Sequence, residues 1–380
     1  MTINDAEVKT SSFKANFVKV GAGFLLGSLV VGGAATAASS DPLGVKACVD
    51  KKTQVMYLST SGACSSTRTL VSLGGSSIDV KSIAALVTPS VVSIEVTTDQ
   101  GTGTGSGSIY QSSATSSYII TNNHVVESAA DTGTITVEMI NGDNFPATIV
   151  GRDATYDIAV IKINKGNLPI INIGDSSKLS VGDPVVAIGS PLGLASTVTS
   201  GIVSALNRPV TTGTTGAESF VDAIQTDAAI NPGNSGGALL DSAGRIVGVN
   251  SAIATLSSDG SSGNIGLGFS IPINEAKRVV DELIATGKST RPYLGIYFDT
   301  TFTGTGAKIL KLSPGEAADK AGIPAGAIIR SIDGVKIADQ VGAIVRIRSY
   351  APGATVTILV DLPTGGQKSF KVLLGSAPSN

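Results

Sequence analysis

Three residue types that together support nucleophilic catalysis occur in this chain in the order histidine, aspartate, serine. The only histidine, His124, follows the apolar segment 118–121, and Asp157 directly precedes another apolar segment. Ser235 stands in the glycine-rich run 231–237. A serine hydroxyl becomes a nucleophile when an imidazole accepts its proton and a carboxylate orients that imidazole. We therefore take His124, Asp157 and Ser235 as candidates for acyl-transfer chemistry.

Each of these residues also has an ordinary interpretation. A Gly-Asn-Ser-Gly-Gly run can be a plain turn, and a single histidine can lie on a surface or in a core. Asp157 can cap a strand or a turn. Asp153 competes with it, but the turn-like Gly-Arg-Asp-Ala stretch around Asp153 predicts an exposed side chain.

Short segments rich in Val, Ile and Thr, separated by Gly, Ser, Asn and Asp, must position these candidates. Such spacing predicts a mostly β protein built of barrels or a sandwich. Residues 101–107 are expected to form a Gly/Thr/Ser turn. The expected strands are 91–96, 118–121, 135–139, 158–163, 184–188, 202–205, 246–249 and 266–271.

Three motifs together resemble the HtrA (Deg) family of trypsin-like serine proteases. They are 121–126, 157–160 and 226–237, and the similarity runs from about residue 87 to the C-terminus. The order of the candidates is that of chymotrypsin-type enzymes, and it differs from the orders in subtilisin and the α/β-hydrolases. The resemblance implies a chymotrypsin-like double β-barrel protease domain over 82–290, followed by a PDZ domain over 291–376.

The resemblance also implies a role for each site residue. Ser235 attacks a peptide carbonyl, His124 accepts its proton, and Asp157 fixes the imidazole. The backbone N–H groups of Gly233 and Ser235 form the oxyanion hole. Asp227 falls outside the base of the pocket and is expected to be structural. Five residues are expected to line the substrate pocket, which favours a small aliphatic side chain: Ala229, Ile230, Phe269, Ser270 and Ile271.

The strand 268–271 is a candidate for backbone pairing with an extended substrate. Helical spacing over 274–286 closes the first domain, and 287–292 is expected to be a linker. The loop of Tyr293, Leu294, Gly295 and Ile296 resembles the carboxylate-binding loop of PDZ domains, with a helix at 340–349 and a strand at 355–362. The alternative is a PDZ-like fold that packs on the protease and binds nothing.

The N-terminal part predicts export from the cytoplasm. Residues 1–19 form a polar leader with lysines, and 20–38 are uncharged and mostly apolar, long enough for a transmembrane helix. The small residues at 35–37 also permit cleavage as a signal peptide; the long leader favours the anchor. In an oxidising compartment, Cys48 and Cys64 are expected to form a disulfide within the linker 39–81.

Composition excludes several other classes. The net charge is −2 over 380 residues, so no basic surface indicates nucleic acid. No histidine or further cysteine stands near the cysteine pair, so neither a metal site nor a cofactor is expected. The family's loop before the histidine strand is short here, at 97–107, which favours a homotrimer or a monomer over large cages.

These observations predict a serine endopeptidase, exported or held by a single membrane helix with its catalytic body outside the cytoplasm. Its expected substrates are unfolded or regulatory envelope proteins, and its PDZ domain is expected to read protein C-termini. The alternative from another class is a noncatalytic scaffold whose degenerate protease body carries a PDZ recruiter.

Overall fold

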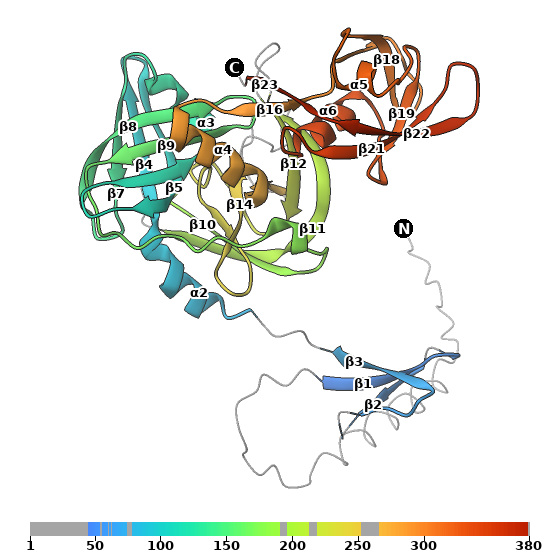
Figure 1. Cartoon of the computed structure of the whole chain (residues 1–380). Coiled ribbons are helices and arrows are strands. Elements are labelled where there is room, and N and C mark those ends of the chain that lie inside the picture. Colours follow the sequence, from blue (N-terminus) through green and yellow to red (C-terminus); the bar gives the residue numbers. More distant parts are fainter. Residues whose placement is uncertain are drawn as a thin grey trace, which may run out of the picture. The chain divides into compact units, whose positions relative to one another are not determined.

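The computed structural model describes residues 45–53, 55–59, 61, 63–73, 78–190, 196–212, 219–251 and 266–378. The chain divides into two compact units, residues 1–77 and residues 78–380, and each is described here by itself (Figure 1). The predicted leader and apolar segment, 1–38, lie outside the described residues. Among the residues that are described, no helix has both the length and the apolar character to span a membrane.

The small N-terminal unit is a three-stranded antiparallel sheet in the order β2-β1-β3. Its strands are β1 (Val45–Asp50), β2 (Met56–Leu58) and β3 (Arg68–Leu73). The predicted disulfide is confirmed: Cys48 and Cys64 are bonded, with their Cα atoms 5.6 Å apart. The segment expected as a linker, 39–81, therefore contains the strands of this sheet, and the next helix begins within it at Val80.

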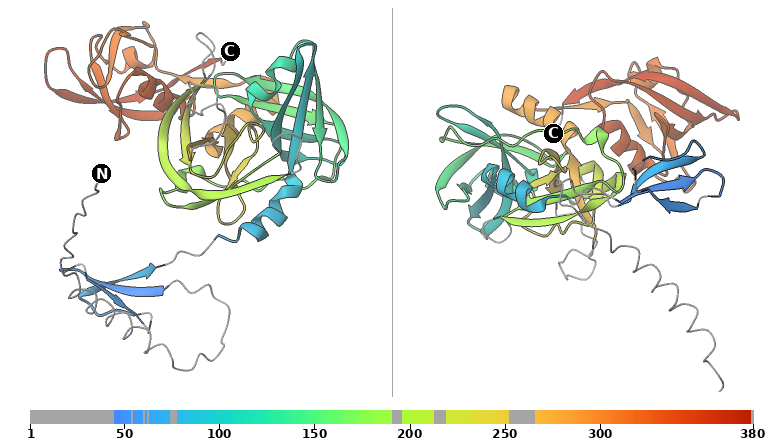
Figure 2. Two further views of the ribbon diagram at one scale, coloured as in Figure 1. Left: turned by 180° about the vertical axis from the view of Figure 1, so that it is seen from behind. Right: turned by 90° about the horizontal axis from the view of Figure 1, so that it is seen from below.

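Two closed barrels form the body of the second unit, and they lie side by side (Figure 2). The first barrel follows the order β4-β5-β6-β9-β8-β7, and the second repeats this connection as β10-β11-β12-β15-β14-β13. The strands of the first are β4 (Val91–Thr98), β5 (Gly101–Ser112), β6 (Ser117–Thr121), β7 (Thr134–Glu138), β8 (Asn144–Asp153) and β9 (Ile158–Ile163). Those of the second are β10 (Pro184–Gly189), β11 (Thr197–Thr212), β12 (Ser219–Thr226), β13 (Ala238–Leu240), β14 (Ile246–Ser251) and β15 (Gly268–Pro272).

The expected turn at 101–107 is instead the first half of β5. This segment pairs with β4 from Gly101 opposite Thr98 to Ser108 opposite Val91. Two of its glycines are needed for close packing: a Cβ on Gly105 would lie 2.5 Å from Val125 Cγ1, and one on Gly107 2.6 Å from Ile119 Cγ2. Glycine in a strand therefore marks close packing here rather than a chain reversal.

Short helices connect and cover the barrels. They are α2 (Val80–Val87), η1 (Thr88–Ser90), α3 (Asn123–Val126), η2 (Glu127–Ala129) and η3 (Ser176–Lys178). The longer α4 (Ile273–Thr286) agrees with the predicted helix and buries its apolar face in the core between the barrels. It ends at Gly287, whose φ of 75° and N–H bond to the Leu283 carbonyl form a left-handed cap.

A C-terminal domain with its own hydrophobic core follows. Its six-stranded sheet runs β17-β18-β19-β21-β22, with β20 paired to β19, and β16 pairs separately with β23. Part of the predicted linker at 287–292 therefore belongs to β16. The elements are β16 (Thr290–Tyr293), β17 (Ile296–Phe298), β18 (Ala307–Leu312), α5 (Ala317–Lys320), β19 (Ile328–Ile332), β20 (Val335–Lys336), α6 (Gln340–Arg348), β21 (Thr355–Asp361), β22 (Gln367–Leu373) and β23 (Gly375–Pro378).

Replacing both Cys48 and Cys64 by serine should unfold the small sheet without disturbing the barrels. A disulfide that closes a loop of about 15 residues contributes about 3 kcal/mol, which is large for so small a sheet. Limited proteolysis should then cut within residues 45–73, while the main thermal transition stays at the wild-type temperature. A main transition lowered by several degrees would contradict the division into two units.

Candidate active site

His124 and Asp157 form a closely bonded pair at the end of the first barrel. His124 lies in α3, directly after β6, and its Nδ1 is 2.9 Å from Asp157 Oδ1 and 2.8 Å from Oδ2. The backbone N–H of His124 also donates to Oδ1 at 3.0 Å. The imidazole side chain is 21% exposed and the carboxylate 5%. Asp157 therefore holds the ring at Nδ1, and the other ring nitrogen, Nε2, takes no part in this pair.

Asp157 holds this position in a constrained backbone conformation. Its φ is 54°, in the left-handed region that a residue other than glycine occupies at a cost. The buried Asn122 amide donates to the Asp157 carbonyl oxygen at 2.9 Å and holds the turn in place.

The expectation that Asp153 is exposed is wrong, because its side chain is 0% exposed. Its Oδ1 accepts N–H groups from Thr155 at 2.8 Å and Tyr156 at 3.2 Å, and its Oδ2 accepts the Ser289 hydroxyl at 2.5 Å. Such bonds from an aspartate to the amides that follow it define a tight turn. Asp153 thus shapes the turn that presents Asp157.

Ser235 lies in a turn that glycines make possible. Gly233 has a φ of 94° and Gly236 a φ of 83°. A Cβ on Gly236 would lie 2.1 Å from the Ser106 carbonyl oxygen and 2.3 Å from Thr121 Oγ1. The Ser235 carbonyl accepts the Ser106 N–H at 2.8 Å. The turn therefore packs against β5 and against the last residue of β6, the strand that leads to His124.

The second barrel closes the site from the other side. The Gly236 N–H donates to the Asn250 carbonyl at 2.9 Å. The next residue, Ser251, donates its hydroxyl to Asp157 Oδ2 at 3.5 Å. Gly236, which follows Ser235, is thus bonded to the residue that precedes Ser251, and Ser251 contacts Asp157.

Two residues of this site were not predicted. The Ser106 hydroxyl accepts the Ser190 N–H at 2.7 Å and donates to the Gly233 carbonyl at 2.6 Å, so it ties the Ser235 turn to both barrels. Ser251 contacts Asp157 as described above. A single serine in a Gly/Ser/Thr-rich segment or in a strand has no sequence pattern that indicates a role. The roles of Ser106 and Ser251 are seen only in their contacts in the folded structure.

One of the predicted pocket residues, Ala229, is bonded to the Ser235 turn. Ile230 is buried, and the Ala229 carbonyl accepts the Asn234 side-chain amide at 3.4 Å. Asp227 accepts the Ile202 N–H at 2.7 Å, the structural role expected of it.

The prediction that strand 268–271 pairs with substrate does not fit β15. Phe269 pairs with Gln225 of β12 and with Ser251 of β14, and Ser270 pairs with Ile224 and Asn250. Both edges of β15 are therefore filled at these residues, and no open edge remains there for a substrate strand. Phe269, Ser270 and Ile271 remain predicted pocket residues, and only their side chains are then expected to contact the substrate.

The predicted loop 293–296 lines a groove of about 200 Å³ in the C-terminal domain. Gly295 has a φ of 74°, and a Cβ there would lie 2.2 Å from Glu316 Cβ, so only glycine fits. The opposite wall is α6, through Ile344, Ile347 and Arg348. β17 is the terminal strand of its sheet, which leaves its outer edge beside this groove unpaired within that sheet.

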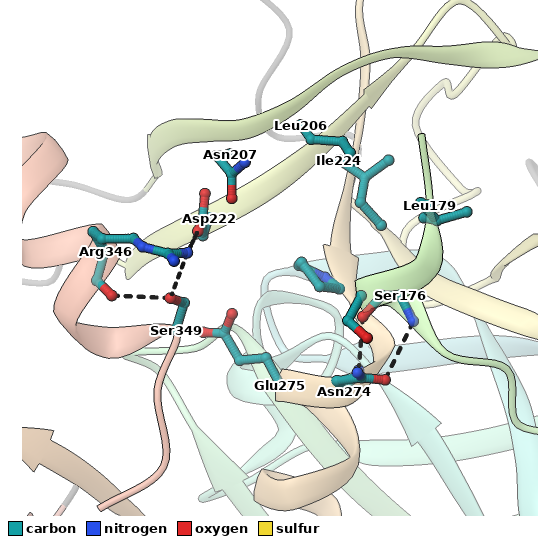
Figure 3. A pocket seen from close by; sticks show the side chains of 12 residues that line it. Ser176, Leu179, Leu206, Asn207, Asp222, Ile224, Asn274, Glu275, Arg346 and Ser349 are labelled. Carbon is teal, nitrogen blue, oxygen red and sulfur yellow. Dashed lines mark hydrogen bonds and ion pairs between the residues drawn. The ribbon is translucent and has the colours of Figure 1, made fainter. Parts of the chain in front are cut away.

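A cavity of about 380 Å³ lies between α6, the second barrel and the start of α4 (Figure 3). Arg346 of α6 forms an ion pair with the buried Asp222 of β12 at 3.4 Å. Glu275 lies beside them, 6% exposed, and neither of its carboxyl oxygens has a hydrogen-bond partner. Burial raises the pKa of Glu275 well above its ordinary value, and the neighbouring Asp222 raises it further.

Among the residues that the structure describes, no group of three or more His, Cys, Asp or Glu side chains is placed so that it could hold a metal ion.

Two closed barrels, a histidine–aspartate pair and a serine in a glycine-rich turn are the features of a trypsin-like serine peptidase. The family described as Trypsin-like peptidase domain matches residues 105–249. Serine protease PepD of Mycobacterium tuberculosis is 47% identical over 310 residues, covering 78% of this chain and 66% of the relative. Serine protease Do-like HtrA of Bacillus subtilis is 40% identical over 259 residues, covering 63% of this chain and 56% of the relative.

Solved structures extend the similarity into the C-terminal domain. HtrA-type protease AlgW with tripeptide is 32% identical with a TM-score of 0.60, covering 80% of this chain and 98% of that one. The serine endoprotease from Yersinia pestis is 34% identical with a TM-score of 0.53, covering 80% of this chain and 100% of that one. The chain therefore belongs to the HtrA family of serine endopeptidases. It spans 66% of the length of its PepD relative and 45% of a DegP-like relative from Chlamydia pneumoniae.

Replacing Glu275 by glutamine should stabilise the protein more at pH 8 than at pH 5. A raised pKa means that the folded state prefers the protonated carboxyl, so stability is greatest below the unfolded pKa near 4.5 and falls as pH rises toward the folded pKa. Each pH unit in that window costs about 1.4 kcal/mol, and glutamine cannot ionise. Thermal melts of both proteins at the two pH values measure the effect; an equal difference at both would contradict it.

Proposed function

We propose that this chain is an exported serine endopeptidase that hydrolyses peptide bonds through Ser235, His124 and Asp157. The observation that carries the proposal is the contact of His124 Nδ1 with both carboxylate oxygens of Asp157, at 2.9 and 2.8 Å. This contact favours the tautomer whose Nε2 accepts a proton. The turn of Ser235 is bonded to the neighbours of both residues, which supports its role as the nucleophile.

The reaction follows from these roles. Ser235 Oγ attacks the substrate carbonyl carbon while its proton passes to His124 Nε2, and Asp157 stabilises the imidazolium that forms. The N–H groups of Gly233 and Ser235 receive the oxyanion, and loss of one such donor raises the barrier by about 2.7–4 kcal/mol. His124 then returns the proton to the leaving amine. Water repeats the sequence on the acyl-enzyme and releases the acid.

Substrates are expected to be extended, unfolded or regulatory polypeptides with a small aliphatic side chain before the cleaved bond. The apolar Ala229 and Ile230 beside the Ser235 turn support this preference, because neither offers a charge to a substrate side chain. Several curated relatives are named periplasmic serine endoproteases, which supports a catalytic body outside the cytoplasm. Tethering by residues 20–38 and assembly as a homotrimer remain predictions.

The C-terminal domain is proposed to be a PDZ domain that binds the C-termini of proteins. The unpaired outer edge of β17 supports addition of a peptide strand between β17 and α6. Backbone N–H groups of the loop at 293–296 would receive the terminal carboxylate. Relatives of known structure include AlgW with a tripeptide and AlgW with a decapeptide, which is consistent with peptide binding in this family.

Replacing Ser235 by alanine should abolish cleavage of an unfolded substrate such as reduced, denatured casein, and should abolish labelling by a fluorophosphonate probe. The melting temperature should stay close to that of the wild type, because the hydroxyl is small and the turn is held by backbone bonds. If wild type is not labelled, or if the variant cleaves as fast as wild type, the enzymatic proposal fails and the noncatalytic scaffold is favoured.

A fluorescent hexapeptide, Gly-Gly-Gly-Ala-Val-Val, should bind the groove through its free C-terminal carboxylate. The same peptide with a C-terminal amide should bind at least tenfold more weakly, because the loop amides lose a charged acceptor. Fluorescence anisotropy measures both affinities. Replacing Ile344, which lines the groove, by aspartate should reduce the difference between the two peptides, because a negative charge in the groove repels the free carboxylate; equal affinity of wild type for both would contradict a carboxylate-binding loop.

A further inference from the structure

Glu275 is a buried carboxyl group to which the fold gives no partner. It is 6% exposed, and neither of its carboxyl oxygens has a hydrogen-bond partner among the described residues. A glutamate at the third position of a helix ordinarily bonds back to the backbone N–H of the N-cap residue. The N-cap of α4 is Pro272, which has no N–H to donate. The usual partner of Glu275 is therefore missing.

This carboxyl group lines the cavity of about 380 Å³ between α6, the second barrel and the start of α4. Figure 3 shows that it points away from α4, toward α6. His124, Asp157 and Ser235 are not among the lining residues, so the cavity is separate from the site that we propose for catalysis. A buried, unpartnered carboxyl group beside an open space of this size indicates a place for a ligand.

The charges that line the cavity do not balance. Asp222 is 7% exposed and forms its ion pair with Arg346 at 3.4 Å. No other charged side chain lines the cavity in the described part of the chain except Glu275, which is left without a counterion there. Buried charges are stable when they are paired, so one positive charge in the cavity completes the lining.

The ionisation of Glu275 follows the same logic. Burial raises the pKa of its carboxyl group well above the ordinary value, and the carboxylates of Asp222 on β12 and Asp153 on β8 raise it further. The guanidinium groups of Arg278 on α4 and Arg348 on α6 lower this pKa, but burial outweighs them and neither lines the cavity. A cation beside the carboxyl group would therefore have to displace its proton, and binding of the cation is linked to pH.

The other part of the lining is apolar. It can contact a hydrocarbon chain, because apolar surface removed from water favours binding. The side chains that form this part are Leu179, Leu206, Ile224 and Pro272. A ligand that fits both parts has one positive charge at one end and a short apolar chain behind it.

We propose that this cavity binds a primary ammonium group carried on a short apolar chain, with Glu275 as its counterion. The ammonium group has three N–H donors, and the two carboxyl oxygens of Glu275 accept from it. The chain lies against the apolar part of the lining. The ion pair between Asp222 and Arg346 stays in place, so the cavity takes a single positive charge rather than two.

The probe for the test is n-pentylammonium, and isothermal titration calorimetry of the full chain measures its affinity. Pentan-1-ol lacks the charge, and n-pentyltrimethylammonium keeps the charge but has no N–H donor. Both should bind at least about tenfold more weakly, because each loses the charge-assisted hydrogen bonds to Glu275. Methylammonium should also bind more weakly, by about fourfold for each methylene that no longer contacts the apolar lining.

The variant for the test is Glu275→Gln, which keeps the shape of the side chain and removes its charge. Asp281→Asn is the matched control, because it makes the same change of charge on the same helix, α4, and Asp281 does not line the cavity. Glu275→Gln should weaken the binding of n-pentylammonium by at least about tenfold, and Asp281→Asn should leave it unchanged. Thermal melts show that both variants are folded.

The pH dependence of the affinity separates a counterion from a merely structural role. In wild type, the affinity should rise from pH 5 to pH 8, because the proton on Glu275 is lost more readily at higher pH and an alkylammonium stays charged up to about pH 10. In Glu275→Gln the affinity should not change over this range. An affinity that is independent of pH in wild type would overturn the proposal.

Three further results would also overturn it. They are the absence of binding to wild type, equal affinities for n-pentylammonium and pentan-1-ol, and equal affinities of wild type and Glu275→Gln. A last comparison identifies the source of the ammonium group. Nα-acetyl-lysine methylamide carries the same group on a peptide backbone, so tighter binding than that of n-pentylammonium assigns the site to lysine side chains, and weaker binding assigns it to free amines.

Discussion

The bond between the His124 imidazole and the Asp157 carboxylate is the constraint on which the rest of this structure depends. Both carboxylate oxygens lie within 3 Å of Nδ1, and a third bond joins the His124 backbone to the same group. Because this carboxylate is almost fully buried, water does not compete with the imidazole for its hydrogen bonds. The imidazole is thus presented in one orientation before any substrate arrives.

Both barrels contribute to holding that bond and the turn of Ser235. The first barrel supplies α3 and the turn at 153–157, and the second supplies the glycine turn of Ser235 and the hydroxyl of Ser251. Ser106 of the first barrel bonds to backbone groups of the second at Ser190 and Gly233. Any sliding of one barrel against the other would break these bonds, so the geometry of the proposed site depends on the interface between the barrels.

Much of this arrangement could be predicted from sequence where a segment is uniform in character. β9 has the predicted bounds, 158–163, because its continuous apolar run fits a strand whose residues are nearly all buried. α4 was predicted because its apolar residues recur at helical spacing. The candidate residues were found because three motifs occurred in a fixed order, and each motif alone would have been ambiguous.

The errors arose where tertiary contacts override local composition. The glycines at 101–107 indicated a turn, yet the segment is a strand, and Gly105 and Gly107 are small because α3 and β6 pack against β5. Asp153 was expected in water, but the Ser289 hydroxyl and two backbone amides replace water around it. The strand at 268–271 was expected to pair with a substrate, but in the barrel its two edges pair with β12 and β14. Ser106 and Ser251 had no local signal, since their partners come from distant sequence.

The measurement that tests the central claim most directly is the tautomer of the only histidine. Selective ¹⁵N-histidine labelling gives one pair of ring signals, so assignment to His124 needs no variant. The account predicts that the neutral ring carries its proton on Nδ1, bonded to Asp157, with Nε2 unprotonated. A proton found on Nε2 would contradict it, because the imidazole could not then accept the proton of Ser235.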